Sequence, residues 1–159
     1  RSNVECQFRY RNSVFKAEGK EIILKGKVEL VPGNKRVLYE SMMAKINYRK
    51  KRHPLEYPNI GSIFKNVPVG DLDGKIAEPH RLVVKTDPFP VIPAAYLIDA
   101  AGLRGRSHGG AMISPRHPNF IVNVLDAKAS DVLALVNLIK EKVKEKFQIQ
   151  LEEEIRIIK

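Results

Sequence analysis

Hydrophobic residues recur at every fourth position between residues 35 and 52, at Leu38, Met42 and Ile46. This spacing places them on one face of a helix, so it predicts an amphipathic helix over the whole stretch. The helix should end at His53, because the proline that follows pushes that residue out of the helical region. We therefore interpret His53 as an inert helix-end residue and not as a general base or metal ligand.

A second and stronger helical pattern follows Ser130, a residue type that favours the N-cap position. The apolar stripe of this predicted helix consists of Val132, Leu135, Val136, Ile139, Val143 and Phe147. A shorter helix of two turns is predicted over residues 94–101, where Gly102 supplies the C-terminal end.

Alternation of apolar and polar residues predicts several short strands. They cover residues 21–31, 112–114, 120–123 and 149–158, together with a short segment that the chain enters at Ser62. Strands and helices occur in one mixed series along the chain. The predicted fold class is therefore α+β, with a small mixed or antiparallel sheet packed with the two main amphipathic helices.

Two segments do not fit this regular series. A short extended piece is predicted within residues 6–16, where Phe8 and Tyr10 alternate with two arginines. Residues 67–93 predict a long loop with an extended piece only at 82–85, because the segment carries Pro68, Pro79, Pro88, Pro90 and Pro93. Such a loop could be a lid, a substrate contact or a tolerated surface insertion.

The turn that runs from Tyr57 to Asn66 is the most informative stretch of the sequence. Proline, asparagine and glycine lead directly into a short alternating segment, so Ser62 lies where the chain reverses and enters a strand. A basic run at residues 48–53 precedes this turn and could bring several cations close to the serine hydroxyl. By itself, a glycine and serine pair before an apolar residue is also common in ordinary tight turns.

Composition limits the classes of protein that the chain can belong to. An apolar fraction of 43% is enough for one ordinary domain core. Cys6 is the single cysteine, which excludes a disulfide framework and a cysteine-rich metal site and favours a reducing compartment. No apolar run reaches the roughly 20 residues needed to span a bilayer, and the first residues lack the apolar core of a signal peptide. We therefore expect a cytoplasmic protein.

Two motif-like stretches predict no ligand site. The Asp-x-Asp-Gly sequence at residues 71–74 has no glutamate at the closing position of a calcium loop, so a simple turn is favoured and no metal is expected. The glycine-rich basic segment 102–111 fits neither the dinucleotide fingerprint nor the phosphate-loop pattern.

The strong positive charge points to a polyanionic ligand. A formal net charge of +10 would attract nucleic acid, a nucleotide-sugar diphosphate or a dinucleotide phosphate. The basic run Arg49–His53 motivates a basic α+β RNA-binding module without catalysis as an alternative function. An aromatic content of 7% without tryptophan offers no clear platform for stacked bases, which disfavours nucleic acid. A structural domain without chemistry is a third reading.

Six motifs in a fixed order resemble the C-terminal half of the UDP-N-acetylenolpyruvoylglucosamine reductase family, also called UDP-N-acetylmuramate dehydrogenases. The resemblance runs through most of the chain, and its specificity lies in the set and not in any single motif. The motifs are Tyr-Arg-x-Ser at 10–13, Tyr-Arg-Lys at 48–50, Gly-Ser-Ile-Phe-Lys-Asn at 61–66, Leu-Ile-Asp-Ala-Ala-Gly-Leu-Arg-Gly at 97–105, Gly-Gly-Ala-Met-Ile-Ser with His-Pro-Asn-Phe-Ile-Val-Asn at 109–123, and Leu-Glu-Glu-Glu-Ile-Arg-Ile-Ile at 151–158.

The resemblance implies an NADPH-dependent, FAD-mediated reduction of UDP-N-acetylglucosamine enolpyruvate to UDP-N-acetylmuramate in peptidoglycan synthesis. It implies that Ser62 protonates the carbon beside the substrate carboxylate while Arg11 and Glu154 stabilise the enol-like intermediate. It also implies substrate contacts by Tyr10, Arg49, Lys50 and Asn66, and flavin contacts by Gly61 and Ser62.

These residue types suit that chemistry. Hydride addition pushes negative charge onto the substrate carboxylate, so a nearby guanidinium in a water-poor site lowers the barrier. A serine is a weak acid and needs helpers for its developing alkoxide, for which Lys50, Lys65 and Asn66 are candidates. A protonated or hydrogen-bonded Glu154 could donate to the enolate.

The resemblance also implies a domain arrangement. Residues 1–33 would be the end of the FAD-binding domain and residues 34–159 the C-terminal substrate-binding domain, with the long loop 67–93 inside it. The family's glycine-rich flavin-binding region is not found among these residues. Because the cofactor carries the hydride chemistry, we expect the isolated chain to be inactive without that region.

Overall fold

The computed structural model describes residues 1–87 and 89–158, so Pro88 and Lys159 lie outside the described residues. The chain divides into two compact units, Arg1–Lys45 and Ile46–Lys159, and each is described here by itself. Helix α2 (Lys35–Arg52) contributes residues to both units. Its bounds agree with the predicted helix, and it ends directly before His53, whose N–H still donates to the Arg49 carbonyl at 2.8 Å.

The first unit begins with turns and a short helix, so the extended piece predicted within residues 6–16 is wrong. Arg9 and Asn12 exchange both of their backbone hydrogen bonds, at 3.0 and 3.1 Å, across a tight reversal. Helix α1 (Val14–Glu18) follows at once and ends at Gly19, which has a left-handed φ of 65°. The alternation of aromatic and cationic residues was too short to outweigh this local turn.

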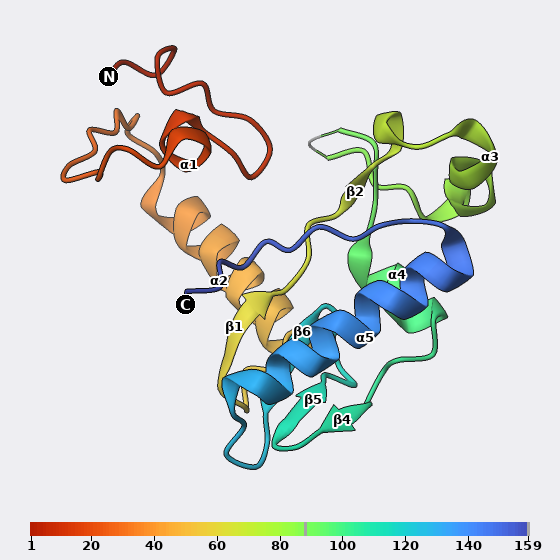
Figure 1. Ribbon diagram of the computed structural model, residues 1–159. Coiled ribbons are helices and arrows are strands. Elements are labelled where there is room, and N and C mark those ends of the chain that lie inside the picture. Colours follow the sequence, from red (N-terminus) through yellow and green to blue (C-terminus); the bar gives the residue numbers. More distant parts are fainter. Residues whose placement is uncertain (88, 159) are drawn as a thin grey trace. The chain divides into compact units, whose positions relative to one another are not determined.

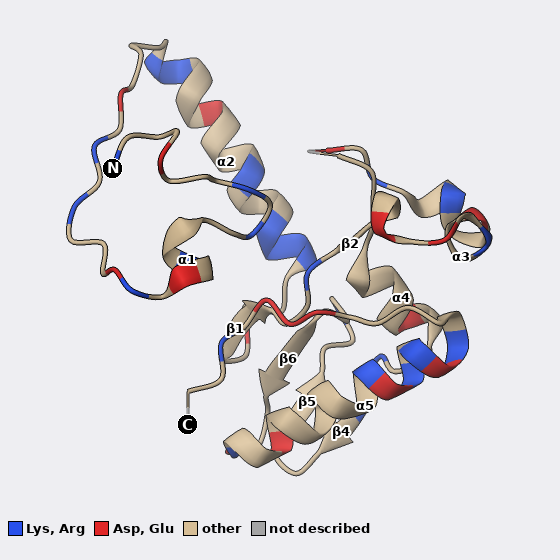
Figure 2. Cartoon of the chain, turned by 45° about the horizontal axis from the view of Figure 1, so that its top comes forward, with Lys and Arg blue, Asp and Glu red and all other residues tan. Residues whose placement is uncertain are grey.

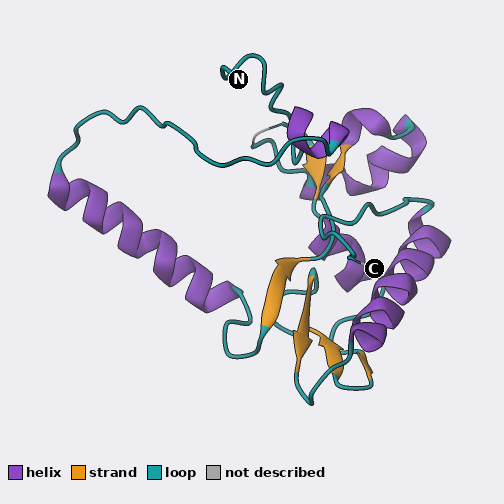
Figure 3. Cartoon of the chain, turned by 60° about the vertical axis from the view of Figure 1, so that its left-hand side comes forward, coloured by secondary structure: helices purple, strands orange, loops and turns teal. Residues whose placement is uncertain are grey.

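Residues 21–31 form no strand, contrary to the prediction from their alternating pattern. Figure 3 shows the stretch between α1 and α2 as a loop. Leu24 is 88% exposed, and within the described residues this segment has no neighbouring strand to pair with. Since β-propensity measures the fit to a paired and partly buried surface, the pattern alone could not produce a strand.

Helix α2 forms without burying its apolar stripe. Leu38 is 58% exposed, Met42 is 47% exposed, and no residue of the helix is buried. Within the described residues, this face of α2 therefore stays largely exposed.

A four-stranded antiparallel sheet forms the centre of the second unit (Figure 1). Its strands are β1 (Asn59–Ser62), β6 (Phe120–Asn123), β5 (Ala111–Ile113) and β4 (Ser107–His108), in that spatial order. The two predicted strands of the central hairpin are thus confirmed to within a residue. The α+β class is confirmed as well.

Helix α5 (Ala129–Phe147) crosses this sheet, and helix α4 (Ala94–Ala100) packs beside α5 (Figure 1). The predicted stripe of α5 is confirmed, since Leu135, Val136, Ile139 and Val143 are buried. Ile63, Phe64, Ile113 and Leu151 join them in one continuous core. Burial of about 1.5–3 kcal/mol per large apolar side chain makes this core the main source of stability.

The start of α5 differs from the prediction. Lys128, and not Ser130, is the N-cap residue, and the carboxylate of Asp131 accepts from the N–H of Lys128 at 3.0 Å. The same carboxylate accepts from the N–H of Gly110 at 3.2 Å. A Cβ at Gly110 would lie 2.2 Å from the Leu125 carbonyl oxygen, so only glycine fits there. The glycine-rich segment thus serves close packing between the β4–β5 turn and α5.

The long segment 67–93 is folded and not a plain loop. Strands β2 (Val67–Pro68) and β3 (Val91–Ile92) pair and close its base. Between them lie η1 (Val69–Asp71), α3 (Gly74–Ala77) and η2 (Glu78–Val83). The extended piece predicted at 82–85 is wrong for its first half, since residues 82 and 83 belong to η2.

The Asp-x-Asp-Gly sequence is a turn, as predicted. The side chain of Asp73 accepts from the N–H of Lys75 at 2.8 Å and caps α3. Among residues 1–87 and 89–158, no group of three or more His, Cys, Asp or Glu side chains could hold a metal ion. None of the helices in the described part of the chain is long and apolar enough to cross a membrane.

The C-terminal segment keeps the predicted alternation but pairs only briefly. Ile149 and Leu151 are buried while Gln150 and Glu152 are exposed. Its β-bridge is an isolated one, between Glu153 and Phe64. The predicted strand over 149–158 is therefore reduced to a short antiparallel contact with the end of β1.

Candidate functional site

Ser62 is displayed by a bulge in strand β1. Asn59 lies opposite Val122 and Ser62 lies opposite Phe120, so β1 contains one more residue than β6 over the same distance. Gly61 takes up the irregularity with a φ of 90°, which favours glycine. Such bulges redirect side chains near functional sites. The described residues offer the half-buried Ser62 hydroxyl no side-chain hydrogen bond, so it is available to a ligand.

Asn119 fixes the backbone directly after Ser62. Its side-chain oxygen accepts from the N–H of Phe64 at 2.9 Å, and its side-chain nitrogen donates to the carbonyl of Phe64 at 2.8 Å. Its own carbonyl accepts from the N–H of Ile63 at 2.8 Å. The sequence pattern does not predict this role, because an asparagine between a proline and a strand is equally typical of an ordinary turn. Its place beside the predicted strand of Phe120 was the one available signal.

The C-terminal segment brings Glu154 next to Ser62 along the backbone. The N–H of Glu154 donates to the carbonyl of Ile63 at 2.8 Å, and the N–H of Lys65 donates to the carbonyl of Glu152 at 2.9 Å. These contacts place residues 152–154 antiparallel to residues 63–65. Two of the three predicted catalytic residues, more than 90 positions apart in the sequence, therefore lie at neighbouring backbone positions.

Charged side chains on this segment are paired. Lys65, only 17% exposed, forms an ion pair with Glu152, and Lys140 of α5 binds Glu153 at 2.8 Å. Burial alone would raise the pKa of Glu153, but the hydrogen bond from Lys140, a backbone hydrogen bond and the lysine charge lower it overall. Lys65, considered a helper for the serine, is thus already held by a carboxylate.

Tyr10 and Arg11 belong to the first unit. The Arg11 guanidinium lies 5.6 Å from the centre of the Tyr10 ring, and Arg11 has a φ of 53°. Its carbonyl accepts from the ammonium of Lys16 at 3.2 Å. The convergence of Arg11 with Ser62 and Glu154 stays a prediction.

Arg49 and Lys50 lie on the exposed last turns of α2. Basic residues occupy the last turn of α2 from Arg49 to Arg52, and Figure 2 shows this end of the ribbon in blue, whereas the C-terminal half of α5 carries both signs. The basic run therefore precedes the turn that leads to β1, as the sequence indicated. Cations at this helix end also suit the negative end of the helix dipole.

Asn66 has a structural contact of its own. Its side-chain oxygen accepts from the N–H of Ala94, the first residue of α4, at 3.1 Å. The amide therefore caps the first N–H group of α4, which has no partner within the helix. Asn66 thereby connects the segment after Ser62 with α4.

Two histidines and a phenylalanine form a cluster beside the end of α2. The ring of His117 lies 5.4 Å from His53 and 4.8 Å from Phe120, which is opposite Ser62 in the sheet. Burial, and secondly the charge of His53, lowers the pKa of His117. Burial, and secondly the charge of Arg49, lowers the pKa of His53. Both rings are therefore favoured in their neutral form.

Comparison with known proteins identifies the family. The sequence model of the UDP-N-acetylenolpyruvoylglucosamine reductase C-terminal domain matches residues 53–158. The reductase of Fervidobacterium nodosum is 39% identical over 155 residues, which are 98% of this chain and 43% of that protein. The reductase of Carboxydothermus hydrogenoformans is 40% identical over 157 residues, which are 97% of this chain and 43% of that protein.

A solved structure agrees with the sequence matches. The crystal structure of UDP-N-acetylenolpyruvylglucosamine reductase from Thermus caldophilus superposes with a TM-score of 0.66 at 31% sequence identity. The match covers 96% of this chain and 46% of that protein. The chain therefore spans less than half the length of these relatives. With its bulge, its C-terminal segment and its sheet covered by α5, the chain belongs to the UDP-N-acetylenolpyruvoylglucosamine reductase family, of which residues 53–158 match the C-terminal domain.

Proposed function

We propose that this chain supplies the substrate-binding half and the proton donor of an enzyme that reduces UDP-N-acetylglucosamine enolpyruvate to UDP-N-acetylmuramate in peptidoglycan synthesis. NADPH would provide the reducing equivalents through FAD. The observation that supports this most is the juxtaposition of Ser62 and Glu154 at the bulge of β1. Family membership makes the reductase reaction the natural one for this pair of groups.

In this proposal Ser62 donates its hydroxyl proton to the carbon beside the substrate carboxylate. A protonated or hydrogen-bonded Glu154 stabilises the enolate that forms as hydride arrives, by donating a hydrogen bond to it. Arg11 would compensate the negative charge on the substrate carboxylate. Each role belongs to a side chain that the sequence had singled out.

The substrate's diphosphate would lie near the cationic end of α2. Lys50 and Arg49 are exposed there and precede the turn that leads to Ser62. Tyr10 and Asn66 are the remaining proposed substrate contacts. A positively charged surface beside the site raises the local concentration of a dianionic ligand.

The bulge suits the close approach of a flat ring. Gly61 has no side chain, and a Cβ built on it would meet no atom within 4 Å, so the space beside its peptide is open. Gly61 and Ser62 are therefore the residues of this chain that we propose to face the isoalloxazine ring. The flavin, when bound, supplies the hydride.

The test uses the full-length enzyme that contains this chain. Ser62→Ala should abolish reduction of the enolpyruvyl substrate while reduction of the flavin by NADPH stays nearly intact. This separation is expected because the hydroxyl acts only in the second half-reaction. Stopped-flow absorbance of the flavin measures both half-reactions.

Ser107→Ala serves as the matched control, because Ser107 is exposed on β4. It should leave both half-reactions unchanged. Equal loss of both half-reactions in Ser62→Ala would refute the proton-donor role. RNA binding with a steep salt dependence, together with no binding of the UDP-sugar, would instead support the RNA-binding module.

A further inference from the structure

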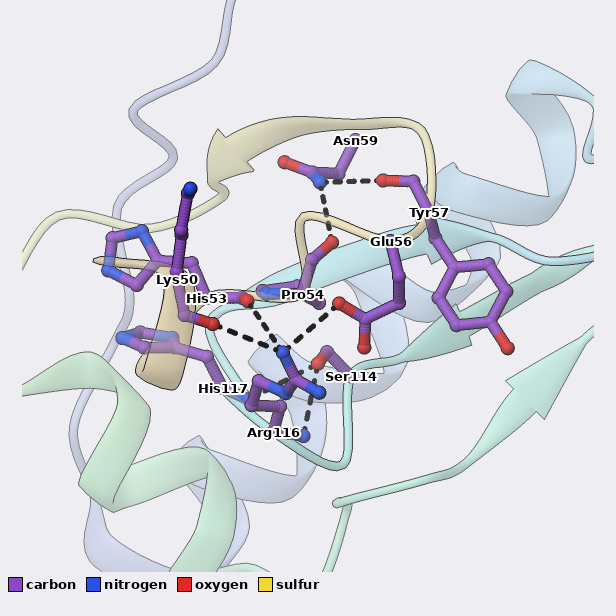
Figure 4. A network of polar contacts seen from close by, with 9 residues as sticks. All are labelled: Lys50, His53, Pro54, Glu56, Tyr57, Asn59, Ser114, Arg116 and His117. Carbon is purple, nitrogen blue, oxygen red and sulfur yellow. Dashed lines mark hydrogen bonds and ion pairs between the residues drawn. The ribbon is translucent and has the colours of Figure 1, made fainter. Parts of the chain in front are cut away.

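Arg116 reaches from the turn between β5 and β6 to the end of α2. Its Nη1 donates to the carbonyl oxygens of Lys50 and His53, each at 3.3 Å, and lies 3.2 Å from a carboxylate oxygen of Glu56. Figure 4 shows these three contacts converging on the one guanidinium. Two backbone carbonyls and one carboxylate of the stretch 50–56 are thereby bound to one side chain that lies 60 to 66 positions later in the sequence.

The contacts satisfy a specific need of a helix end. The last carbonyl groups of a helix have no intrahelical partner and carry the negative end of the helix dipole. The Nη1 atom of a guanidinium carries two N–H groups, so it can donate to both carbonyl oxygens while the positive charge attracts the carboxylate. Arg116 therefore acts as a C-terminal cap of α2 supplied by another part of the chain.

The turn that carries Arg116 is itself held firmly. The hydroxyl of Ser114, which is fully buried, accepts from the N–H of Arg116 at 3.1 Å and from the N–H of His117 at 3.2 Å. Arg104 donates to the Pro115 carbonyl while its guanidinium binds Asp99 at 2.7 and 2.6 Å. The guanidinium of Arg116 thus projects from a fixed base.

The other partner of the contact, the turn between α2 and β1, is also fixed. The side-chain nitrogen of Asn59 donates to the carbonyls of Pro54 at 3.1 Å and Tyr57 at 2.9 Å. Asn59 is the first residue of β1, and Ser62 is the last. A displacement at the end of α2 is therefore transmitted to the strand that displays the serine.

We propose that Arg116 is a positioning residue that sets the Lys50 side chain relative to Ser62. The proposal rests on the proposed function, because it assumes that Lys50 contacts the substrate. Arg116 itself need not touch the substrate. Without it, the last turn of α2 would fray, and Lys50 would lose its fixed distance from the serine.

The first test is a double-mutant cycle in the full-length enzyme. Arg116→Ala should raise the KM for the enolpyruvyl substrate on the order of tenfold, with a smaller change in kcat. In a Lys50→Ala background the same change should raise KM by less than about twofold, because the side chain that it positions is already absent. An undiminished effect of Arg116→Ala in that background would overturn the proposal.

The second test does not depend on the proposed function. Amide hydrogen exchange is measured on the same full-length protein, and Arg116→Ala should accelerate exchange at residues 49–56 while the amides of α5 keep their rates. Unchanged exchange at 49–56 would also overturn the proposal, whatever the outcome for Ser62. A failed Ser62 test with accelerated exchange would instead refute only the catalytic assignment.

Two further variants complete the design. Arg116→Lys keeps the charge but places it on a flexible and strongly hydrated ammonium, so it should give intermediate exchange rates and an intermediate KM. If Arg116→Ala fails to fold, Arg116→Lys supplies the same two measurements. Arg106→Ala removes an equal charge from an exposed position and should change neither exchange nor KM.

Discussion

Asn119 holds Phe64 by both polar groups of its backbone, with hydrogen bonds of 2.9 and 2.8 Å across 55 positions of the sequence. Both partners are buried, Asn119 with 4% and Phe64 with 1% of its surface exposed. A buried side-chain amide that replaces a missing strand partner in this way is difficult to substitute, because any other side chain leaves a donor or an acceptor unpaired.

Asn119→Leu should therefore destabilise the chain. Each buried group left without a hydrogen bond costs about 1–3 kcal/mol, and two such groups arise on Phe64. Asn119→Asp keeps the acceptor but places a carboxylate oxygen against the buried carbonyl of Phe64, so it should also destabilise the chain. Unfolding in urea, followed by circular dichroism, measures the change in the free energy of unfolding.

Asn137→Ala is the control for this series. Asn137 is exposed on α5, so the change should stay within about 0.5 kcal/mol. If Asn119→Leu is as mild as this control, the paired hydrogen bonds do not stabilise the segment after Ser62.

Glu154→Gln tests the second catalytic assignment. The amide keeps the size of the side chain but can neither carry a proton nor hold a negative charge, so kcat should fall by about 100-fold or more with a smaller effect on KM. Steady-state kinetics of the full-length enzyme measures both. A defect confined to KM would contradict the role of Glu154, and Glu141→Gln on the exposed side of α5 should change neither.

The histidine cluster predicts a loss of stability at mildly acidic pH. The ordinary histidine pKa is 6.5, and burial lowers it in the folded chain for both His117 and His53. The unfolded chain therefore binds more protons as the pH falls through that value, and the free energy of unfolding decreases until the folded pKa is reached. Above the unfolded pKa the contribution to stability is complete.

Urea unfolding between about pH 7.5 and about pH 5 measures this dependence. His117→Gln should flatten the profile, whereas His108→Gln should leave it unchanged, because His108 is exposed on β4. A profile of the unmodified chain that rises toward acid would show that the cluster accepts protons readily in the folded state.

The sequence pattern correctly predicted those helices and strands that are determined by residues close together in the sequence. The proline after His53 and the periodic stripe of α5 determine helices through neighbouring residues alone. The hairpin of β5 and β6 likewise follows from two alternating segments around a short turn. In each case the residues that decide the structure lie within a few positions of one another.

The failures lie where a partner distant in the sequence decides the outcome. Residues 21–31 have the pattern of a strand but no pairing neighbour among the described residues. Ser130 was a suitable cap by type, yet Asp131 binds both Lys128 and Gly110 and moves the start of the helix. Secondary-structure propensity gives the conformations that a residue favours, whereas these distant contacts decide which conformation it adopts in the folded chain.

The candidate site likewise contains residues that the sequence could indicate and residues that it could not. The family motifs imply roles for Ser62 and Glu154, and these roles stay proposals. The sequence pattern could not predict the roles of Asn119 and Arg116. Both side chains bind backbone atoms, and such hydrogen bonds leave no recognisable motif in the sequence. Residues that position other residues are therefore harder to predict from sequence than residues that belong to a catalytic motif.

Strands β2 and β3 pair at the base of segment 67–93, so the length of the segment does not affect the geometry of the site. Val67 lies opposite Ile92, so the chain leaves and re-enters the core at adjacent points. The folded excursion between them can grow, shrink or exchange its helices while β1 and α4 keep their positions. An insertion or deletion between β2 and β3 would thus lengthen or shorten this excursion and leave the bulge of β1 unchanged.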